Sequence, residues 1–131
     1  MPTPAAGALP EPREGAEGLR VDETRRDGVV FLTLRGELDI RTSPHLRGRL
    51  ADIVRRGEED VVIDMCAVGF VDSTGLAVLL NALRRLTRAE RRLVLVCPDG
   101  AVLRMLRLTR LDSTFTVRST HADALAALRG A

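Results

Sequence analysis

The most specific chemical motif in the chain is the segment 69–76, which reads GFVDSTGL. It lies between an apolar run that ends near Met65 and an amphipathic pattern that begins near Leu76. This placement predicts that Ser73 is the N-cap of a helix, at the positive end of the helix dipole and beside unpaired backbone N–H groups. A phosphate group on the Ser73 hydroxyl would be stabilised there.

The same residues also fit a purely structural role, because Asp and Ser commonly cap helices. The residues alone therefore leave two interpretations of Asp72 and Ser73 open, a helix cap and a site of modification. Gly75 falls in the first turn, where glycine costs up to about 1 kcal/mol relative to alanine. We expect another demand to explain it, such as the close approach of a partner backbone.

Other nucleophilic or metal chemistry has little support in the residue pattern. A catalytic serine needs a base, and the only histidines, His45 and His121, stand at no spacing that indicates a triad. Together with Cys66 and Cys97 they show no recognised spacing of metal ligands. We expect no enzymatic activity, no metal and no cofactor, both histidines on helix surfaces, and both cysteines as buried free thiols.

Composition excludes several further classes of protein. The 131 residues are 45% hydrophobic and 29% charged, which is typical of one soluble domain. There are three Phe, no Trp or Tyr, and all 20 basic residues are Arg, so aromatic stacking platforms and lysine chemistry are unavailable to the chain. The net charge of +2 is spread along the chain, and pairs such as Arg91-Arg92 are interpreted as solvated helix ends. We expect no direct nucleic-acid binding.

No stretch is apolar for long enough to span a membrane, and no signal peptide is recognisable at the N-terminus. Two cysteines without CxxC spacing agree with a reducing compartment. We therefore expect a cytoplasmic protein without membrane contact.

The elements that position these residues alternate between strands and helices. Apolar, β-branched runs predict strands at 19–21, 29–34, 61–65, 93–96 and 115–117, the first two forming a hairpin around Asp27-Gly28 and the second closed by Gly36. Apolar residues at helical spacing predict helices over 43–57, 76–86, 99–108 and 120–128, with caps at Ser43, Asp99 and Thr120. This order predicts an α/β fold with a mixed, largely parallel sheet and amphipathic helices.

The first eighteen residues differ in character, because they contain four of the six prolines, three glycines and a single leucine. We expect a flexible, disordered tail over 1–18 and one folded domain over 19–131.

The segment 69–76, together with Gly36, Glu37, Leu38 and Asp39 about thirty residues upstream, resembles the STAS domain of bacterial anti-sigma factor antagonists, the regulators of sporulation and stress response. The resemblance covers roughly 19–128. In that family the serine directly after the aspartate is phosphorylated by the anti-sigma factor, which is itself a serine kinase. The resemblance therefore implies that Ser73 is the acceptor, in preference to Thr74.

The resemblance also implies partner switching. The unphosphorylated protein would bind the anti-sigma factor kinase, which supplies ATP and Mg²⁺, and so release a sigma factor, until phosphorylation ends the binding. A Mg²⁺- or Mn²⁺-dependent phosphatase would restore the free serine. The residues implied in partner binding are Asp72, Thr74, Gly75, Gly36, Glu37, Leu38 and Asp39.

Two alternatives stay open. Residues 37–39 equally fit a solvated turn with Leu38 in the core, and the second-ranked function for the chain is a STAS subunit of another phosphorylation-controlled signalling assembly. A DNA-binding regulator is less well supported, because no helix-turn-helix pattern is present. The second Asp-Ser-Thr tripeptide, at 112–114, is followed by Phe115 instead of Gly-Leu and is interpreted as a loop cap.

Overall fold

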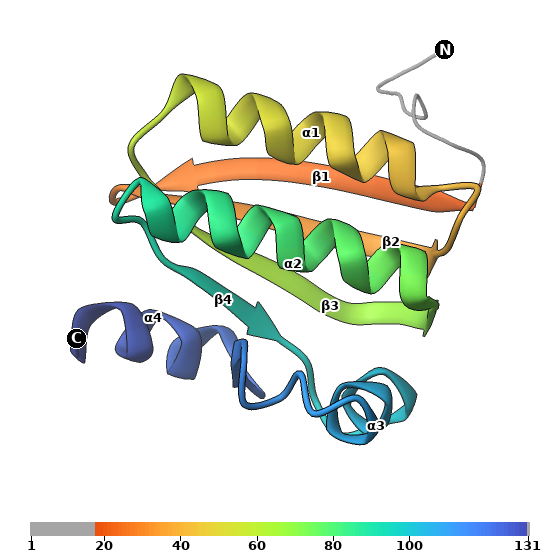
Figure 1. Ribbon diagram of the computed structural model, residues 1–131. Helices are drawn as coiled ribbons and strands as arrows, with labels where there is room; N and C mark the ends of the chain where they lie inside the picture. The colour runs from red at the N-terminus through yellow and green to blue at the C-terminus, as the bar shows by residue number, and fades with distance from the viewer. Residues whose placement is uncertain (1–17, 131) are drawn as a thin grey trace, which may run out of the picture.

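The computed structural model describes residues 18–130. They form five strands in one sheet, in the order β1-β2-β3-β4-β5, with four helices (Figure 1). The elements are β1 Leu19–Arg26, β2 Val29–Leu38, α1 Ser43–Arg56, β3 Asp60–Val71, α2 Ser73–Arg88, β4 Leu93–Val96, α3 Ala101–Leu108, β5 Thr116–Arg118 and α4 His121–Gly130. The predicted α/β fold is confirmed. The predicted tail over 1–18 lies, apart from Gly18, outside the described residues.

The sheet is largely parallel, as predicted. β1 and β2 form an antiparallel hairpin, and β2, β3, β4 and β5 pair in parallel. The two residues that connect the hairpin, Asp27 and Gly28, both have positive φ angles of 54° and 77°. A two-residue turn with this backbone matches the right-handed twist of the strands, which is why the Asp-Gly pair marks the hairpin in the sequence.

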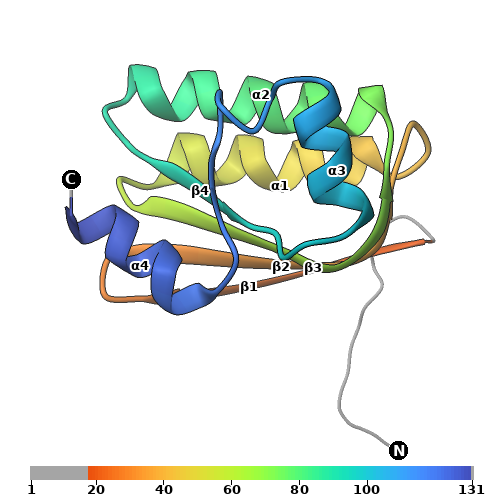
Figure 2. The ribbon, with the colours of Figure 1, turned by 90° about the horizontal axis from the view of Figure 1, so that it is seen from below.

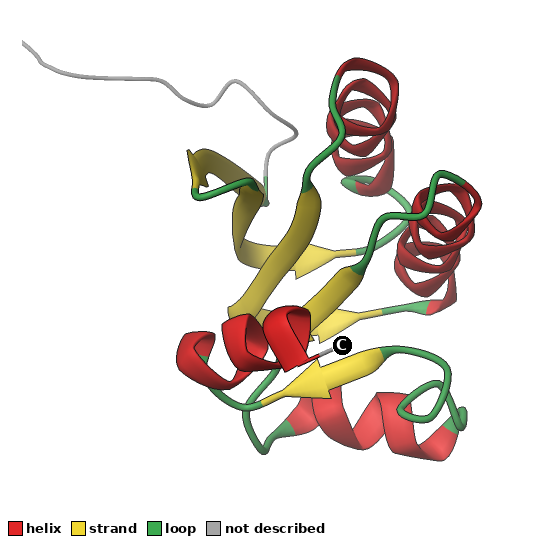
Figure 3. Ribbon diagram, turned by 90° about the vertical axis from the view of Figure 1, so that its left-hand side faces the viewer, coloured by secondary structure: helices red, strands yellow, loops and turns green. Residues whose placement is uncertain are grey.

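The helices cover the two faces of the sheet unequally. α1 and α2 lie side by side on one face and α4 lies on the other, as the end-on view in Figure 3 shows. The larger core cluster joins the first face to α1, α2 and α3, while a smaller cluster joins the second face to α4 through Ala124 and Leu128. Both clusters are aliphatic except for Phe31 and Phe115, as the composition predicts.

Two strand ends differ from prediction. β3 continues past Met65 to Val71, and β2 continues past Gly36 to Leu38. The register of the β2–β3 pairing shifts twice, between Thr33 and Arg35 and between Gly36 and Glu37. After each shift the two strands pair again, so that the ladder continues to Leu38 and Val71. The first three residues of the GFVDSTGL segment, 69–71, are therefore strand, and α2 begins at Ser73 instead of near residue 76.

Two helix ends also differ. Gly100, and not Asp99, is the N-cap of α3, because the helix begins one residue later than an Asp99 cap requires. At the last helix the prediction is confirmed, since the Thr120 hydroxyl accepts a hydrogen bond from the Asp123 amide at 3.1 Å.

The pair Arg91-Arg92 is not a solvated helix end. The Arg91 guanidinium is buried and donates hydrogen bonds to the carbonyl oxygens of Ile53 and Val54 in the last turn of α1, and of Glu59 just before β3. Arg92 donates to two carbonyl oxygens at the end of α4. Both arginines therefore satisfy C-terminal carbonyl groups that lack intrahelical partners.

Candidate functional site

The two motifs that the sequence singles out meet at one edge of the sheet. β2 and β3 are parallel neighbours, so their carboxyl ends lie together, with Glu37 paired to Phe70 and Leu38 to Val71. The loop after β2 then leads into α1, and the single residue Asp72 leads from β3 into α2. This arrangement joins residues more than thirty positions apart in one surface.

Asp72 holds the two loops together. It is the N-cap of α2, and its Oδ1 accepts a hydrogen bond from the Gly75 amide at 2.9 Å. Its Oδ2 accepts from the Ile40 amide at 3.2 Å, and its own amide donates to the Leu38 carbonyl at 3.1 Å. Asp72, and not Ser73, is thus the capping residue, because its extended backbone turns the carboxylate over the first turn of α2.

Ser73 is the first residue of α2, and its side chain is exposed. Its hydroxyl and the backbone N–H groups of Ser73 and Thr74 have no hydrogen-bond partner within residues 18–130. These N–H groups lie at the positive end of the helix dipole, which favours a negative group. With Asp72 as the cap, the Ser73 hydroxyl is exposed and takes no part in capping α2.

Gly75 is required by a contact inside the chain. A Cβ atom at this position would lie 2.6 Å from Leu38 Cγ and 2.8 Å from the Leu38 carbonyl oxygen. The close approach that we expected from a partner backbone is therefore made by β2. Leu38 is fully buried, which confirms that it packs in the core.

A glycine is also required at position 36 by contacts within the chain. Its φ angle is +117°, and a Cβ atom there would clash with the Gly18 carbonyl oxygen, which accepts the Glu37 amide at 2.8 Å. Gly36, Leu38 and Gly75 thus determine the backbone shape of this surface. None of them places a side chain on it, because the two glycines have none and Leu38 is buried.

The turn at 39–43 is internally hydrogen-bonded. Asp39 Oδ1 accepts from the amides of Arg41 and Thr42 at 2.9 and 3.1 Å, and the buried Thr42 hydroxyl donates to the Glu37 carbonyl at 2.9 Å. The Ser43 hydroxyl donates a hydrogen bond to the Asp39 carbonyl oxygen at 2.6 Å. The predicted cap at Ser43 is therefore wrong, and the N-cap of α1 is Thr42. The turn is therefore rigidly shaped before any partner binds.

Burial tends to raise the pKa of Asp39, but the Thr42 and Arg41 amides and the Arg41 guanidinium outweigh this effect. The net result is a pKa below the usual value for aspartate, so Asp39 is charged at neutral pH. Its Oδ2 lies 3.2 Å from Arg41 Nη2.

Two apolar side chains on this surface were not recognised as site residues from the sequence. Ile40 is 70% exposed and Phe70 is 48% exposed, and they are two of the three large hydrophobic residues exposed within 18–130. Ile40 lies in the turn after β2, and Phe70 is the residue before the last of β3. The sequence carries no local signal of their exposure, because both are apolar residues at or beside apolar strand ends. We call Glu37, Asp39, Ile40, Phe70 and Ser73 the Ser73 surface.

The remaining polar groups that the sequence singled out lie elsewhere. His121 Nε2 lies 2.6 Å from Asp64 Oδ2, and its ring stacks on Phe31 at 5.9 Å between ring centroids. Burial tends to raise the pKa of Asp64, but the His121 and Cys66 hydrogen bonds lower it overall. His121 thus joins α4 to β3 and is not simply on a helix surface.

The two cysteines differ. Cys97 is buried as predicted, whereas Cys66 is exposed, because alternation along β3 turns it to the α4 face beyond the region that α4 covers. Burial and the neighbouring Asp64 carboxylate raise the pKa of the Cys66 thiol to about 11.

Within residues 18–130, no group of three or more His, Cys, Asp and Glu side chains is placed to hold a metal ion. No helix in this part of the chain is both long and apolar enough to cross a membrane.

The second Asp-Ser-Thr tripeptide lies in the turn after α3, where the Ser113 hydroxyl donates to the Arg110 carbonyl, as the loop-cap interpretation predicts.

Comparison with known proteins gives concordant results. The family model for the STAS domain matches residues 20–124. The anti-sigma-F factor antagonist RsfB of Mycobacterium tuberculosis is 31% identical over 114 residues, which cover 87% of this chain and 93% of that protein. The anti-sigma-B factor antagonist of Staphylococcus aureus is 27% identical over 99 residues, 76% of this chain and 92% of that protein. The crystal structure of an anti-sigma factor antagonist from Mycobacterium paratuberculosis is similar with a TM-score of 0.78 and 32% identity, covering 88% of this chain and 98% of that one.

Proposed function

The chain belongs to the STAS domain family of anti-sigma factor antagonists, and we propose that its unphosphorylated form binds an anti-sigma factor serine kinase and so releases a sigma factor. The names of its relatives support the antagonist role. The single observation that carries the switch is the position of Ser73, exposed at the start of α2 with an unpartnered hydroxyl. The proposed place of action is the cytoplasm, where RNA polymerase works.

The proposed docking region is the Ser73 surface. Ile40 and Phe70 offer apolar area to a partner, and Glu37 offers an exposed carboxylate to basic side chains, with Arg41 as its present neighbour at 3.8 Å. Asp39 would contribute through the shape of its turn, because its carboxylate is only 14% exposed and already pairs with Arg41. Thr74 would contribute its unpartnered amide. Asp72, Gly36, Leu38 and Gly75 act by holding the two loops in register.

Phosphorylation at Ser73 ends the binding for electrostatic reasons. The phosphate adds about −1.5 to −2 charge at neutral pH, which lowers the net charge of the chain from +2 to about zero. Glu37, Asp39 and Asp72 are acidic at this edge, and Arg41, which pairs with Glu37 and Asp39, offsets only one of these three charges. The phosphate must therefore be desolvated beside an excess of like charge when a partner docks. The free protein tolerates the same phosphate, because the amides at the start of α2 and solvent both stabilise it.

The kinase partner supplies ATP and Mg²⁺, and the chain acts as its substrate rather than as a catalyst. A Mg²⁺- or Mn²⁺-dependent serine phosphatase then restores the free hydroxyl. Exposure of Ser73 supports access by both enzymes.

The test uses the purified full chain and its cognate kinase with ATP and Mg²⁺. We expect one phosphate per chain, assigned to Ser73 by tandem mass spectrometry, and none in Ser73→Ala. The alanine variant should hold the kinase in the presence of ATP, and Ser73→Asp should bind at least tenfold more weakly.

Thr74→Ala is the matched control and should be phosphorylated like the wild type. Stoichiometric phosphorylation of Ser73→Ala would show that the acceptor is wrong. Phosphorylation at Ser73 without any release of a sigma factor would show that the switch serves a different assembly.

A further inference from the structure

A groove runs along the second half of α2, outside the Ser73 surface. It lies between α2 and the connection from α3 to β5, which runs beside α2 in Figure 2. The groove is open to solvent and has a volume of about 480 Å³, within the range of about 300 to 1,000 Å³ that is common for ligand sites. It is lined by Leu80, Leu83, Arg84, Thr87, Arg88, Leu111 and Thr114, and we call it the α2 groove.

Its lining separates into an apolar part and a positively charged part. Leu80, Leu83 and Leu111 are half-buried and pack against the main core, so they present a leucine surface inside the groove. Arg84 and Arg88 are exposed and stand four residues apart, on one side of the helix.

The charge of the α2 groove is not compensated. Neither Arg84 nor Arg88 forms an ion pair within residues 18–130, no acidic side chain lines the groove, and α2 contains no acidic residue. The two guanidinium groups beside the leucine surface therefore have no counter-charge. An anionic ligand would supply one.

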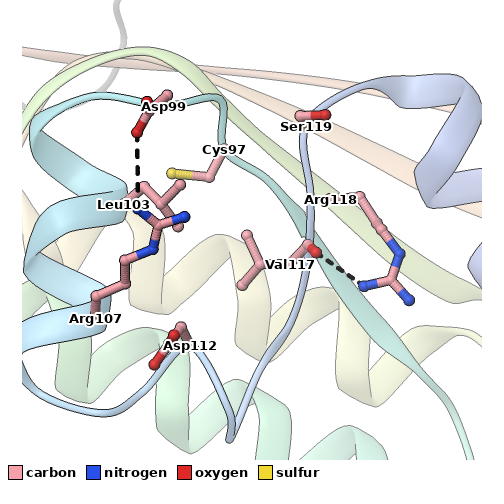
Figure 4. A pocket seen from close by; sticks show the side chains of 8 residues that line it. All are labelled: Cys97, Asp99, Leu103, Arg107, Asp112, Val117, Arg118 and Ser119. Atoms are coloured by element: carbon pink, nitrogen blue, oxygen red, sulfur yellow. Dashed lines mark hydrogen bonds and ion pairs between the residues drawn. The ribbon is translucent and has the colours of Figure 1, made fainter.

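A second hollow of similar size shows the contrast. It lies at the carboxyl ends of β4 and β5 and also contains two arginines, Arg107 and Arg118 (Figure 4). There Arg107 lies 3.9 Å from Asp99, Arg118 donates to the Val117 carbonyl, and Asp112 adds a second carboxylate. The charges of this hollow balance, so it has no preference for an anion.

We propose that the α2 groove binds an acidic amphipathic peptide segment of a partner protein. Apolar side chains of the segment pack on Leu80, Leu83 and Leu111, and its carboxylates pair with Arg84 and Arg88. This is the helix-in-groove mode of recognition, with charge complementarity setting the sign of the partner.

The lining argues against the other anionic partners. Nucleic acid would call for aromatic side chains on which bases stack, and the groove has none. A bilayer surface would call for protruding apolar side chains, whereas these leucines are recessed.

The α2 groove is separate from the Ser73 surface, and the proposal does not rest on the proposed function. Arg84 follows Ser73 by eleven residues in one helix, which corresponds to about 16 Å along the axis. A segment bound there leaves the Ser73 hydroxyl accessible, so the state of Ser73 does not control this binding.

The test uses a synthetic 14-residue peptide with Leu at helical spacing, Glu elsewhere and one Trp. Because the chain has no Trp or Tyr, the Trp fluorescence reports on the peptide alone. We expect saturable binding that weakens with salt, is at least tenfold weaker for the double variant Arg84→Glu/Arg88→Glu, and stays within threefold for Arg84→Lys/Arg88→Lys.

The matched control is Arg47→Glu/Arg56→Glu, which makes the same charge change on exposed positions of α1 outside the groove. It should bind within threefold of the wild type, as should Ser73→Asp. Circular dichroism and urea midpoints verify that each variant is folded. Equal weakening by both double reversals, equal binding of a Lys-for-Glu peptide, or preferential binding to single-stranded DNA or phosphatidylglycerol vesicles would overturn the proposal.

Discussion

The Asp72 carboxylate makes two hydrogen bonds with different roles, and a pair of substitutions separates them. Oδ1 caps α2 by accepting from Gly75, and Oδ2 fastens the β2–α1 loop by accepting from Ile40. Asp72→Ala removes both. Asp72→Asn keeps an oxygen for the cap but places an NH₂ group where the Ile40 amide needs an acceptor.

The magnitudes follow from the two bonds. Loss of an N-cap costs about 0.5–2 kcal/mol, and loss of one further hydrogen bond costs about 0.5–1.5 kcal/mol. Asp72→Ala should therefore lower the free energy of unfolding by roughly 1–3 kcal/mol. Asp72→Asn should lower it by about 0.5–1.5 kcal/mol, because asparagine caps about as well as aspartate.

Urea denaturation at pH 7 measures both values, and amide hydrogen exchange assigns them. In Asp72→Asn the Ile40 amide should exchange about tenfold faster for each 1.4 kcal/mol lost locally, while the Gly75 amide keeps its protection. In Asp72→Ala both amides should exchange faster. Equal protection of Ile40 in all three proteins would refute the idea that this carboxylate joins the two loops.

Further predictions concern the glycines, the buried arginine and two titrating groups. Gly75→Ala should destabilise the protein by about 1–3 kcal/mol despite the better helix propensity, whereas Gly48→Ala, with open space around its Cβ, should stabilise it by about 0.5–1 kcal/mol; thermal unfolding compares them. Arg91→Ala should cost about 3–5 kcal/mol in urea denaturation, since three carbonyl groups lose a buried donor. The lowered pKa of Asp64 means that its stabilising effect is complete above its unfolded pKa of about 3.9 and is lost as pH falls through the folded value; the stability difference between wild type and Asp64→Asn should therefore shrink in acid. With a pKa of about 11, Cys66 should react with a maleimide at pH 7 much more slowly in the folded protein than in urea.

Each of these has a contrary outcome. Stabilisation by both alanines would mean that β2 yields to the new methyl group at position 75. A loss below 1 kcal/mol for Arg91→Ala would mean that water replaces its hydrogen bonds. A stability difference at position 64 that grows in acid would reverse the sign of the argument, and fast labelling of folded Cys66 would show an available thiolate.

Local patterns determined much of what the structure confirms. Apolar runs and helical spacing predicted the element types and their order. A helix with one buried face places apolar residues every three to four positions, whereas a central strand buried on both faces is a continuous apolar run. The Asp27-Gly28 turn was recognisable because its backbone geometry favours those residue types. The sequence left Leu38 open between a partner-binding residue and a core residue, and its complete burial places it in the core.

Element ends were less predictable. The extension of β3 to Val71 depends on register shifts against β2, and those involve residues about thirty positions apart. Ser43 and Asp99 looked like caps because each is a good capping residue, but Thr42 and Gly100 occupy the N-cap positions. Arg91 looked solvated because burial of an arginine depends on carbonyl groups from α1 that its own neighbours do not reveal.

The sequence by itself determined that Ser73 lies at the start of a helix, and that the chain has few aromatic side chains and no lysine. Only the tertiary structure decided that Asp72 is the cap and that the close approach of Leu38 requires a glycine at position 75. It also decided that Ile40 and Phe70 are exposed beside the serine. The physical reason is that helix propensity and capping act over a few residues, whereas this surface is made where two parallel strands end together. Their pairing joins 36–43 to 70–75, and no local pattern carries that information.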